Sequence, residues 1–189
     1  MFADRLNDVR LVMEENEIDA LLLSVGADLP YFTGYEAMPL ERLTMLVLPR
    51  EGQAKLIVPG LEAPRVQEHP DIFTLRPWKE SEDPIAILVE ELGAATSVAV
   101  GDTTWTRFTI ELLNQLPNLK LSRANMITSP IRSIKSSEEI KRLQKAASAV
   151  DRIASRLQNG EIQLIGKSES QVSNELGRQI LEEGHHRVN

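Results

Sequence analysis

Short apolar runs alternate with amphipathic helical patterns over the first two thirds of the chain, and this alternation constrains the fold more than any other feature. Apolar residues recur at helical spacing over 3–16, which predicts a helix that buries one face. The apolar run 20–23 lies between polar and turn-forming residues and predicts a buried strand. Further strands are expected over 43–48, 54–58, 72–75, 97–100 and 119–121, and further helices over 61–66, 84–92 and 103–116.

This order of elements predicts the fold class. The turn sequence Pro49-Arg50-Glu51-Gly52 joins two expected strands as a hairpin, whereas the other consecutive strands are expected to need crossovers. Asp83 and Gly93 are expected to begin and end the helix over 84–92. The segment 28–42, DLPYFTGYEAMPLER, contains many turn-forming and aromatic residues and is expected to be an exposed connection. Residues 1–128 therefore predict an α/β fold, a mixed sheet with helices on its faces.

The pattern changes after Ser129-Pro130, where two long helices follow without strands of their own. Ser136-x-x-Glu139 and Ser168-x-x-Gln171 have the capping-box spacing and predict helices to about Gln158 and Glu183. Apolar residues at 3-4-3-4-3 spacing over 140–157 form a row along the first of these helices. The row is shorter than a coiled-coil seam requires, so packing against a sheet or a neighbouring helix is the preferred interpretation.

Composition excludes several classes of function. The chain has 189 residues and no cysteine, which rules out disulfides, thiolate catalysis and Cys-containing zinc sites. A net charge of -7 and an aromatic content of 4% argue against binding to nucleic acid or to an anionic membrane. Because no segment approaches the ~18 consecutive apolar residues of a membrane span and the N-terminus lacks a signal-peptide pattern, a cytoplasmic protein is expected.

The local catalytic and metal-binding motifs are weak. Gly166-Lys167-Ser168 lacks the spacing of a phosphate-binding loop, and Gly160 and Ser168 are better interpreted as helix caps. The histidines at 185–186 and the adjacent glutamates lie around a helix end without a known ligand spacing. Ser24 precedes Gly26, but the sequence has no strained nucleophile turn such as Gly-x-Ser-x-Gly.

Asp28 and Asp102 are the two carboxylates that follow expected strands. Two acids at one edge of a sheet could take part in a dinuclear metal site, which needs carboxylates on facing elements. The alternative is that both are turn and cap residues, a role for which aspartate is well suited. The second interpretation is preferred because the expected strands themselves carry almost no acids.

Three stretches together resemble the creatinase/aminopeptidase P/prolidase family. The first matches the connection and strand pair of that family's amino-terminal domain, the second its linker, and the third its next helix, with Ile165 in place of the usual proline. The matching residues are Asp28, Tyr31, Phe32, Thr33, Gly34, Tyr35 and Arg42; then Arg132, Ile134, Lys135, Ser136, Glu139, Ile140 and Ala146; then Gly166, Ser168 and Glu169.

The resemblance implies a fold and an activity for the longer protein. The implied fold is a creatinase-type, ribonuclease-H-like mixed sheet over 1–129, followed over 130–189 by a linker and the first two helices of an incomplete pita-bread catalytic domain. Family peptidases hold two divalent metals, manganese, cobalt or zinc, with two Asp, one His and two Glu, and all five positions fall beyond Asn189. The resemblance therefore implies no catalytic, cofactor or metal residue in this chain, which alone is expected to be inactive.

The expected role is the amino-terminal part of an Xaa-Pro dipeptidase or aminopeptidase that covers the active site and supports contacts in a homo-oligomer, a dimer. Short proline-containing peptides are the expected substrates of the whole enzyme. Tyr31, Phe32, Tyr35 and Arg42 are candidates for facing a cleft or a partner subunit, with aromatic packing beneath the connection as the alternative. Two other functions stay open: a non-catalytic binding or scaffold protein on the same fold, and part of a creatinase-type C–N hydrolase.

Overall fold

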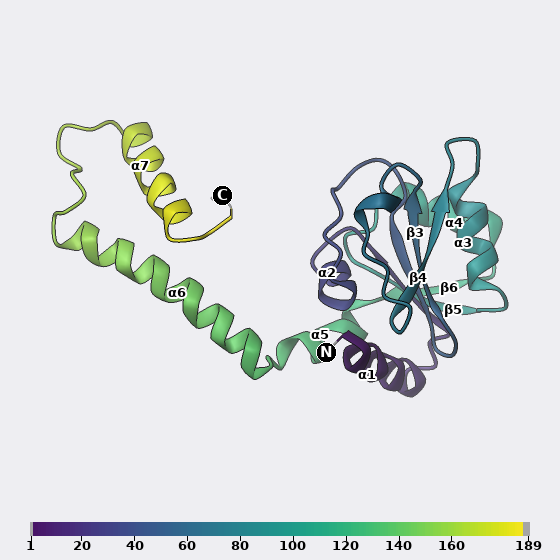
Figure 1. Cartoon of the computed structure of the whole chain (residues 1–189). Helices are drawn as coiled ribbons and strands as arrows, with labels where there is room; N and C mark the ends of the chain where they lie inside the picture. The colour runs from purple at the N-terminus through teal and green to yellow at the C-terminus, as the bar shows by residue number, and fades with distance from the viewer. Residues whose placement is uncertain (1, 187–189) are drawn as a thin grey trace. The chain divides into compact units, whose positions relative to one another are not determined.

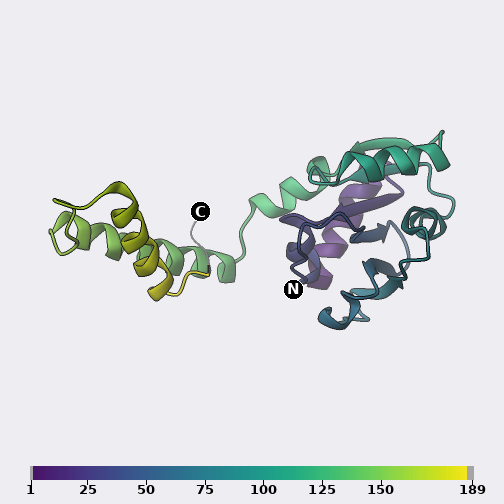
Figure 2. The same ribbon diagram turned by 90° about the horizontal axis from the view of Figure 1, so that it is seen from above.

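The computed structural model describes residues 2–186, which form two compact units (Figures 1 and 2). The first unit ends at Ser133 and the second begins at Ile134. The boundary expected after residue 129 lies inside a helix, α5.

The first unit contains a six-stranded sheet with helices on both faces. Its strands are β1 (Ala20–Ser24), β2 (Met45–Pro49), β3 (Ala54–Pro59), β4 (Phe73–Trp78), β5 (Ser97–Val100) and β6 (Lys120–Arg123). Its helices are α1 (Phe2–Glu15), α2 (Asp28–Thr33), α3 (Pro84–Leu92), α4 (Thr106–Gln115) and α5 (Asn125–Ser133), with a 3-10 turn at Ala63–Arg65.

The sheet is mixed, with the strand order β4-β3-β2-β1-β5-β6. Strand β1 pairs in parallel with β5, and β5 with β6, so the carboxyl ends of these three strands meet at one edge of the sheet. The β2–β3 hairpin is confirmed, and Gly52 takes the positive φ of 96° that its turn requires. The expected α/β class, a mixed sheet flanked by helices, is confirmed.

The period-two pattern of each central strand divides its side chains between two cores. Leu21 and Leu23 face the core beneath α1, α2 and α5, whereas Leu22 faces the core beneath α3 and α4. All five residues of β1 are buried because helices cover both faces of the sheet. The large buried side chains Met13 and Phe32 fill the first core, and Phe108 and Leu112 fill the second.

Three sequence-based expectations need correction. Residues 28–33 are not an exposed connection, because they form α2, in which Leu29, Phe32 and Thr33 are buried. A crossover was expected between the first two strands, but β1 and β2 are antiparallel neighbours. The connection that contains α2 therefore returns the chain directly beside β1. Helix α5 was not expected because Pro130 lies inside it, but burial of Ile127 and Thr128 holds it against the first core.

The second unit consists of α6 (Ser137–Gln158) and α7 (Glu169–Glu182). Both predicted capping boxes are present: the Ser136 and Ser168 hydroxyls accept the backbone N–H of Glu139 and Gln171. Helix α7 folds back along α6, and Ala149 and Ile153 become buried. Within residues 2–186, none of the helices combines the length and the apolar character that a membrane crossing requires.

Candidate functional site

The sequence-predicted aromatic residues Tyr31 and Phe32 lie on α2 and face different surroundings. The Phe32 side chain is fully buried in the first core. The Tyr31 ring lies 3.7 Å from the Arg5 guanidinium carbon and 5.6 Å from that of Arg132, and it packs edge-on against Phe32. Arg5 is only 9% exposed and donates a 2.7 Å hydrogen bond to the Tyr31 carbonyl oxygen. These contacts join α1, α2 and α5.

Tyr35 and Arg42 lie at the two ends of the loop that follows α2. Together with Glu62 they line a cavity of about 10 Å³, which is about the space that one water molecule occupies. Burial raises the pKa of the Tyr35 hydroxyl, and the nearby Glu62 carboxylate raises it further. Arg42 forms a 3.3 Å ion pair with Glu80 and stays partly exposed. The structure therefore brings Tyr35 and Arg42 together at a site too small for a peptide.

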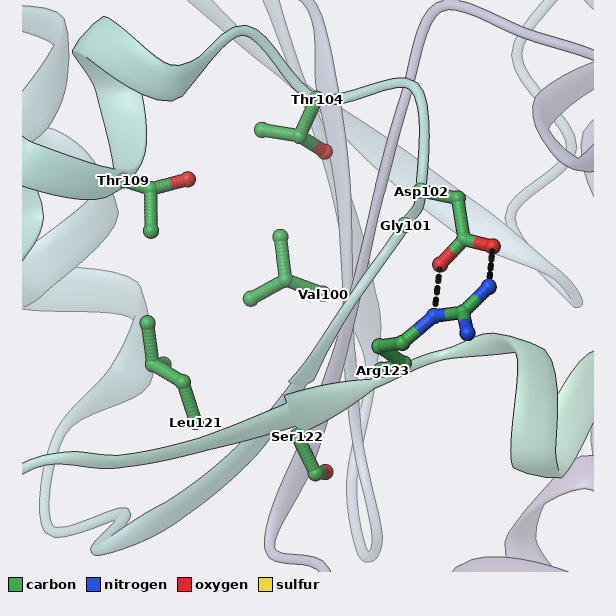
Figure 3. A pocket seen from close by; sticks show the side chains of 8 residues that line it. All are labelled: Val100, Gly101, Asp102, Thr104, Thr109, Leu121, Ser122 and Arg123. Carbon is green, nitrogen blue, oxygen red and sulfur yellow. Dashed lines mark hydrogen bonds and ion pairs between the residues drawn. The ribbon is translucent and has the colours of Figure 1, made fainter.

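A larger pocket, of about 540 Å³, lies at the carboxyl ends of the adjacent parallel strands β5 and β6 (Figure 3). This is the edge at which open α/β sheets commonly bind ligands. The loops that follow β1 and β5 are in close contact there, since a Cβ atom on Gly26 would lie 2.3 Å from the Thr103 hydroxyl oxygen. The pocket is lined by Val100, Gly101, Asp102, Thr104, Thr109, Leu121, Ser122 and Arg123.

One ion pair provides the charged groups of this pocket. Arg123 donates from Nη2 to Asp102 Oδ2 at 2.5 Å and from Nε to Oδ1 at 3.1 Å, the forked geometry that favours guanidinium–carboxylate binding (Figure 3). The hydrogen bond from Arg123 lowers the pKa of the Asp102 carboxyl, and the same bond raises that of the guanidinium. Both groups therefore stay charged near neutral pH.

Asp28, the other carboxylate that follows a parallel strand, binds a different arginine. Arg132 Nη1 donates to Asp28 Oδ1 at 2.5 Å, and the Thr128 hydroxyl donates to Oδ2 at 3.2 Å. Asp28 and Asp102 thus each neutralise a separate arginine. Neither carboxylate belongs to a group of three or more acidic or histidine side chains placed to hold a metal ion in the described part of the chain.

The part of the chain that the structure describes contains no group of three or more acidic or histidine side chains placed to hold a metal ion. Glu182 and Glu183 instead pair with Arg178 and Arg152, and His185 is half-buried. The residues present therefore do not fit the dinuclear centre that the family resemblance implies for a longer protein. We assign no metal-dependent step to any of them.

Arg123 and Thr104 are not predicted from the sequence as pocket residues. Arg123 lies two residues beyond the strand expected over 119–121, and Thr104 lies at the start of the helix expected over 103–116, so neither has a distinctive local pattern. Only the parallel pairing of β5 with β6 brings them to one pocket. Of the pocket residues, only Asp102 could be predicted to lie at this edge, because it follows an expected strand.

The fold and this edge of the sheet define a layered α/β domain with a mixed six-stranded sheet. The creatinase/prolidase N-terminal domain family model matches residues 5–134. The chain belongs to this family.

Known proteins resemble the chain along its whole length. A probable dipeptidase of Mycobacterium tuberculosis is 28% identical over 192 aligned residues, which include all of this chain and 50% of the relative. The crystal structure of a dipeptidase from Mycobacterium ulcerans matches with a TM-score of 0.85 and 29% identity over all of this chain and 51% of that one. A prolidase from Thermococcus sibiricus matches with a TM-score of 0.87 and 26% identity over 97% of this chain and 50% of that one. The chain thus spans about half the length of the curated relatives it matches.

Proposed function

We propose that this chain is the amino-terminal part of a proline-directed peptidase of the Xaa-Pro dipeptidase type. The observation that carries the proposal is the extent of the match. The family model ends at residue 134, but the similarity to the mycobacterial dipeptidase continues through the second unit to cover all of the chain. The second unit therefore matches sequence that follows the amino-terminal domain in a dipeptidase.

The second unit has an apolar surface that suits this role. Ile140, Leu143 and Val150 belong to the predicted apolar row of α6, and they are 45%, 57% and 47% exposed. Helix α7 covers Ala149 and Ile153 instead. We propose that the row packs against the catalytic half of the whole protein, of which residues 130–189 would be the beginning. Exposed apolar area of this kind marks a contact surface.

Catalysis in this proposal belongs to the remaining half of the protein. Two divalent metals would be held there, since residues 2–186 have no group of ligands for them. The first unit would cover the active site and contribute contacts in a homodimer. Tyr31, Tyr35 and Arg42 are the candidates for such contacts, because all three are partly exposed, whereas Phe32 is fully buried within its own unit.

The test starts from the gene. The reading frame that encodes Asn189 is sequenced onward, and the complete product is assayed against Xaa-Pro dipeptides with and without added Mn²⁺. We expect two Asp, one His and two Glu of the family pattern downstream, and metal-dependent release of proline. Residues 1–189 alone, the matched control, should release none. A complete product that lacks these ligands would favour the scaffold alternative, and one that has them but leaves Xaa-Pro bonds intact would refute the proposed substrate class.

A further inference from the structure

The pocket at the carboxyl edge of β5 and β6 presents two opposite charges side by side. The forked contact uses two of the five N–H donors of Arg123 and one lone pair on each Asp102 oxygen, so both groups retain free hydrogen-bonding capacity. The Arg123 and Asp102 side chains are 76% and 39% exposed, which lets a ligand reach them from solvent. An exposed pair of this kind contributes little net stability, so a ligand can also separate the two groups at low cost.

The rest of the pocket is lined by apolar side chains and by side chains that carry a hydroxyl group. Val100 and Leu121 extend from adjacent strands into it, and Figure 3 shows the Thr109 hydroxyl directed toward the side of the pocket that Thr104 and Val100 line. The Thr104 hydroxyl oxygen is buried and has no hydrogen-bond partner in the described part of the chain. An unsatisfied buried hydroxyl is costly, which favours an additional polar group beside it. A volume of about 540 Å³ lies within the range of small-molecule sites.

We propose that this pocket binds a small zwitterion, a free α-amino acid with an aliphatic side chain. The ligand's carboxylate would bind the Arg123 guanidinium, and its ammonium group would bind the Asp102 carboxylate. The aliphatic side chain would contact Val100 and Leu121. A simple anion or a simple cation fits less well, because each would be attracted by one member of the ion pair and repelled by the other. The proposal rests on this pocket alone and does not require the peptidase function.

The experiment is a titration of ¹⁵N-labelled chain followed by NMR, with L-valine as the probe. Isobutylamine and isovalerate serve as matched ligands, since each keeps the branched hydrocarbon and lacks one of the two charges of valine. We expect saturable shifts of the Gly101, Asp102 and Thr104 amide signals with a dissociation constant of about 1 mM. Both single-charge ligands should bind at least about tenfold more weakly, the consequence of losing one charged contact.

Two variants and one control locate the binding. Asp102→Asn and Arg123→Gln should each weaken valine binding at least about tenfold, because each removes one charge of the pair. Arg107→Gln removes an exposed guanidinium of the same unit, one that pairs with Glu111 on α4, and should leave binding unchanged. Unchanged amide spectra outside the pocket show that each variant is folded. The proposal is overturned by shifts that fail to saturate, by isovalerate or isobutylamine binding as tightly as valine, or by valine binding that both pocket variants retain.

Discussion

Single side chains connect distant segments of the first unit, and Asp19 gives a clear case. Its carboxylate accepts hydrogen bonds from the Thr96 amide and hydroxyl and from the Ser97 amide, at 2.9–3.1 Å, and it lies 3.4 Å from Arg50. These bonds lower the pKa of Asp19, with the Thr96 amide as the largest cause. One carboxylate thus joins the beginning of β1 to that of β5 and to the end of β2.

Replacing this carboxylate should reduce stability in a pH-dependent way. We expect Asp19→Ala to lower the free energy of unfolding by about 1–2 kcal/mol at pH 7, after allowance for partial exposure of the group. Because the folded-state pKa lies below the ordinary value of 3.8, the stabilisation is fully present above that value and is lost as the pH falls through the folded-state pKa. Urea denaturation at a series of pH values measures both effects.

The matched control is Glu51→Ala, which removes an exposed carboxylate from the nearby hairpin turn. It should change stability by less than about 0.5 kcal/mol. A difference between Asp19→Ala and the unmodified chain that stayed constant from pH 7 to pH 3 would show that the carboxylate charge is not the source of the stabilisation.

Helix ends and helix packing decide which elements form. Helix α6 begins at a complete capping box, in which Ser136 accepts the Glu139 amide and the Glu139 carboxylate accepts the Ser136 amide. Most of its apolar row is exposed, so local interactions contribute a large share of its stability. Helix α5 shows the opposite balance, since it contains Pro130 and depends on burial of Ile127 and Thr128.

We therefore expect α6 to be sensitive to its cap. Ser136→Ala should destabilise the helix by about 1 kcal/mol, because the Glu139 amide loses its side-chain acceptor. Amide hydrogen exchange in the first turns of α6 should become about fivefold faster. Ser137→Ala, one residue further along and also exposed, is the control and should leave exchange nearly unchanged. Equal exchange rates in the two variants would contradict a stabilising role for the capping box.

At the scale of the whole molecule, the two units differ in how completely each buries its apolar residues. The first unit encloses two cores, one on each face of its sheet. The second unit buries Ala149, Ile153 and Ile162 and leaves Ile165 and Leu143 at 90% and 57% exposure. The first unit therefore has what independent folding requires, and the second does not.

Truncation tests this difference. Residues 1–133 alone should unfold cooperatively, with a midpoint temperature within about 4 °C of the intact chain, the shift that about 1 kcal/mol produces in a domain of this size. Residues 134–189 alone should show weak helical circular dichroism without a cooperative transition, because two helices bury too little apolar surface. A large fall in the melting temperature of the first fragment would show that the units stabilise each other.

Most elements could be predicted from sequence, and the failures have physical causes. The expected strand over 72–75 is longer, since β4 continues through Pro77, which an edge strand tolerates. Helix α2 was missed because Pro30 and Gly34 resemble a loop, although Leu29 and Phe32 are anchored in the core. The pocket was missed because Arg123 and Thr104 have no distinctive local pattern.

By itself, the sequence determined the alternation of strands and helices, the β2–β3 hairpin and both capping boxes, because each depends on residues close together in the chain. It also determined the family, because the motifs that carry the resemblance keep their order along the chain. Only the tertiary structure decided that β2 lies antiparallel beside β1, that Phe32 is buried, and that Asp102 meets Arg123 at the carboxyl edge of β5 and β6. These features depend on strand order and on the packing of helices against the sheet. Strand order and packing arise from contacts between residues far apart in the chain, which no local pattern encodes.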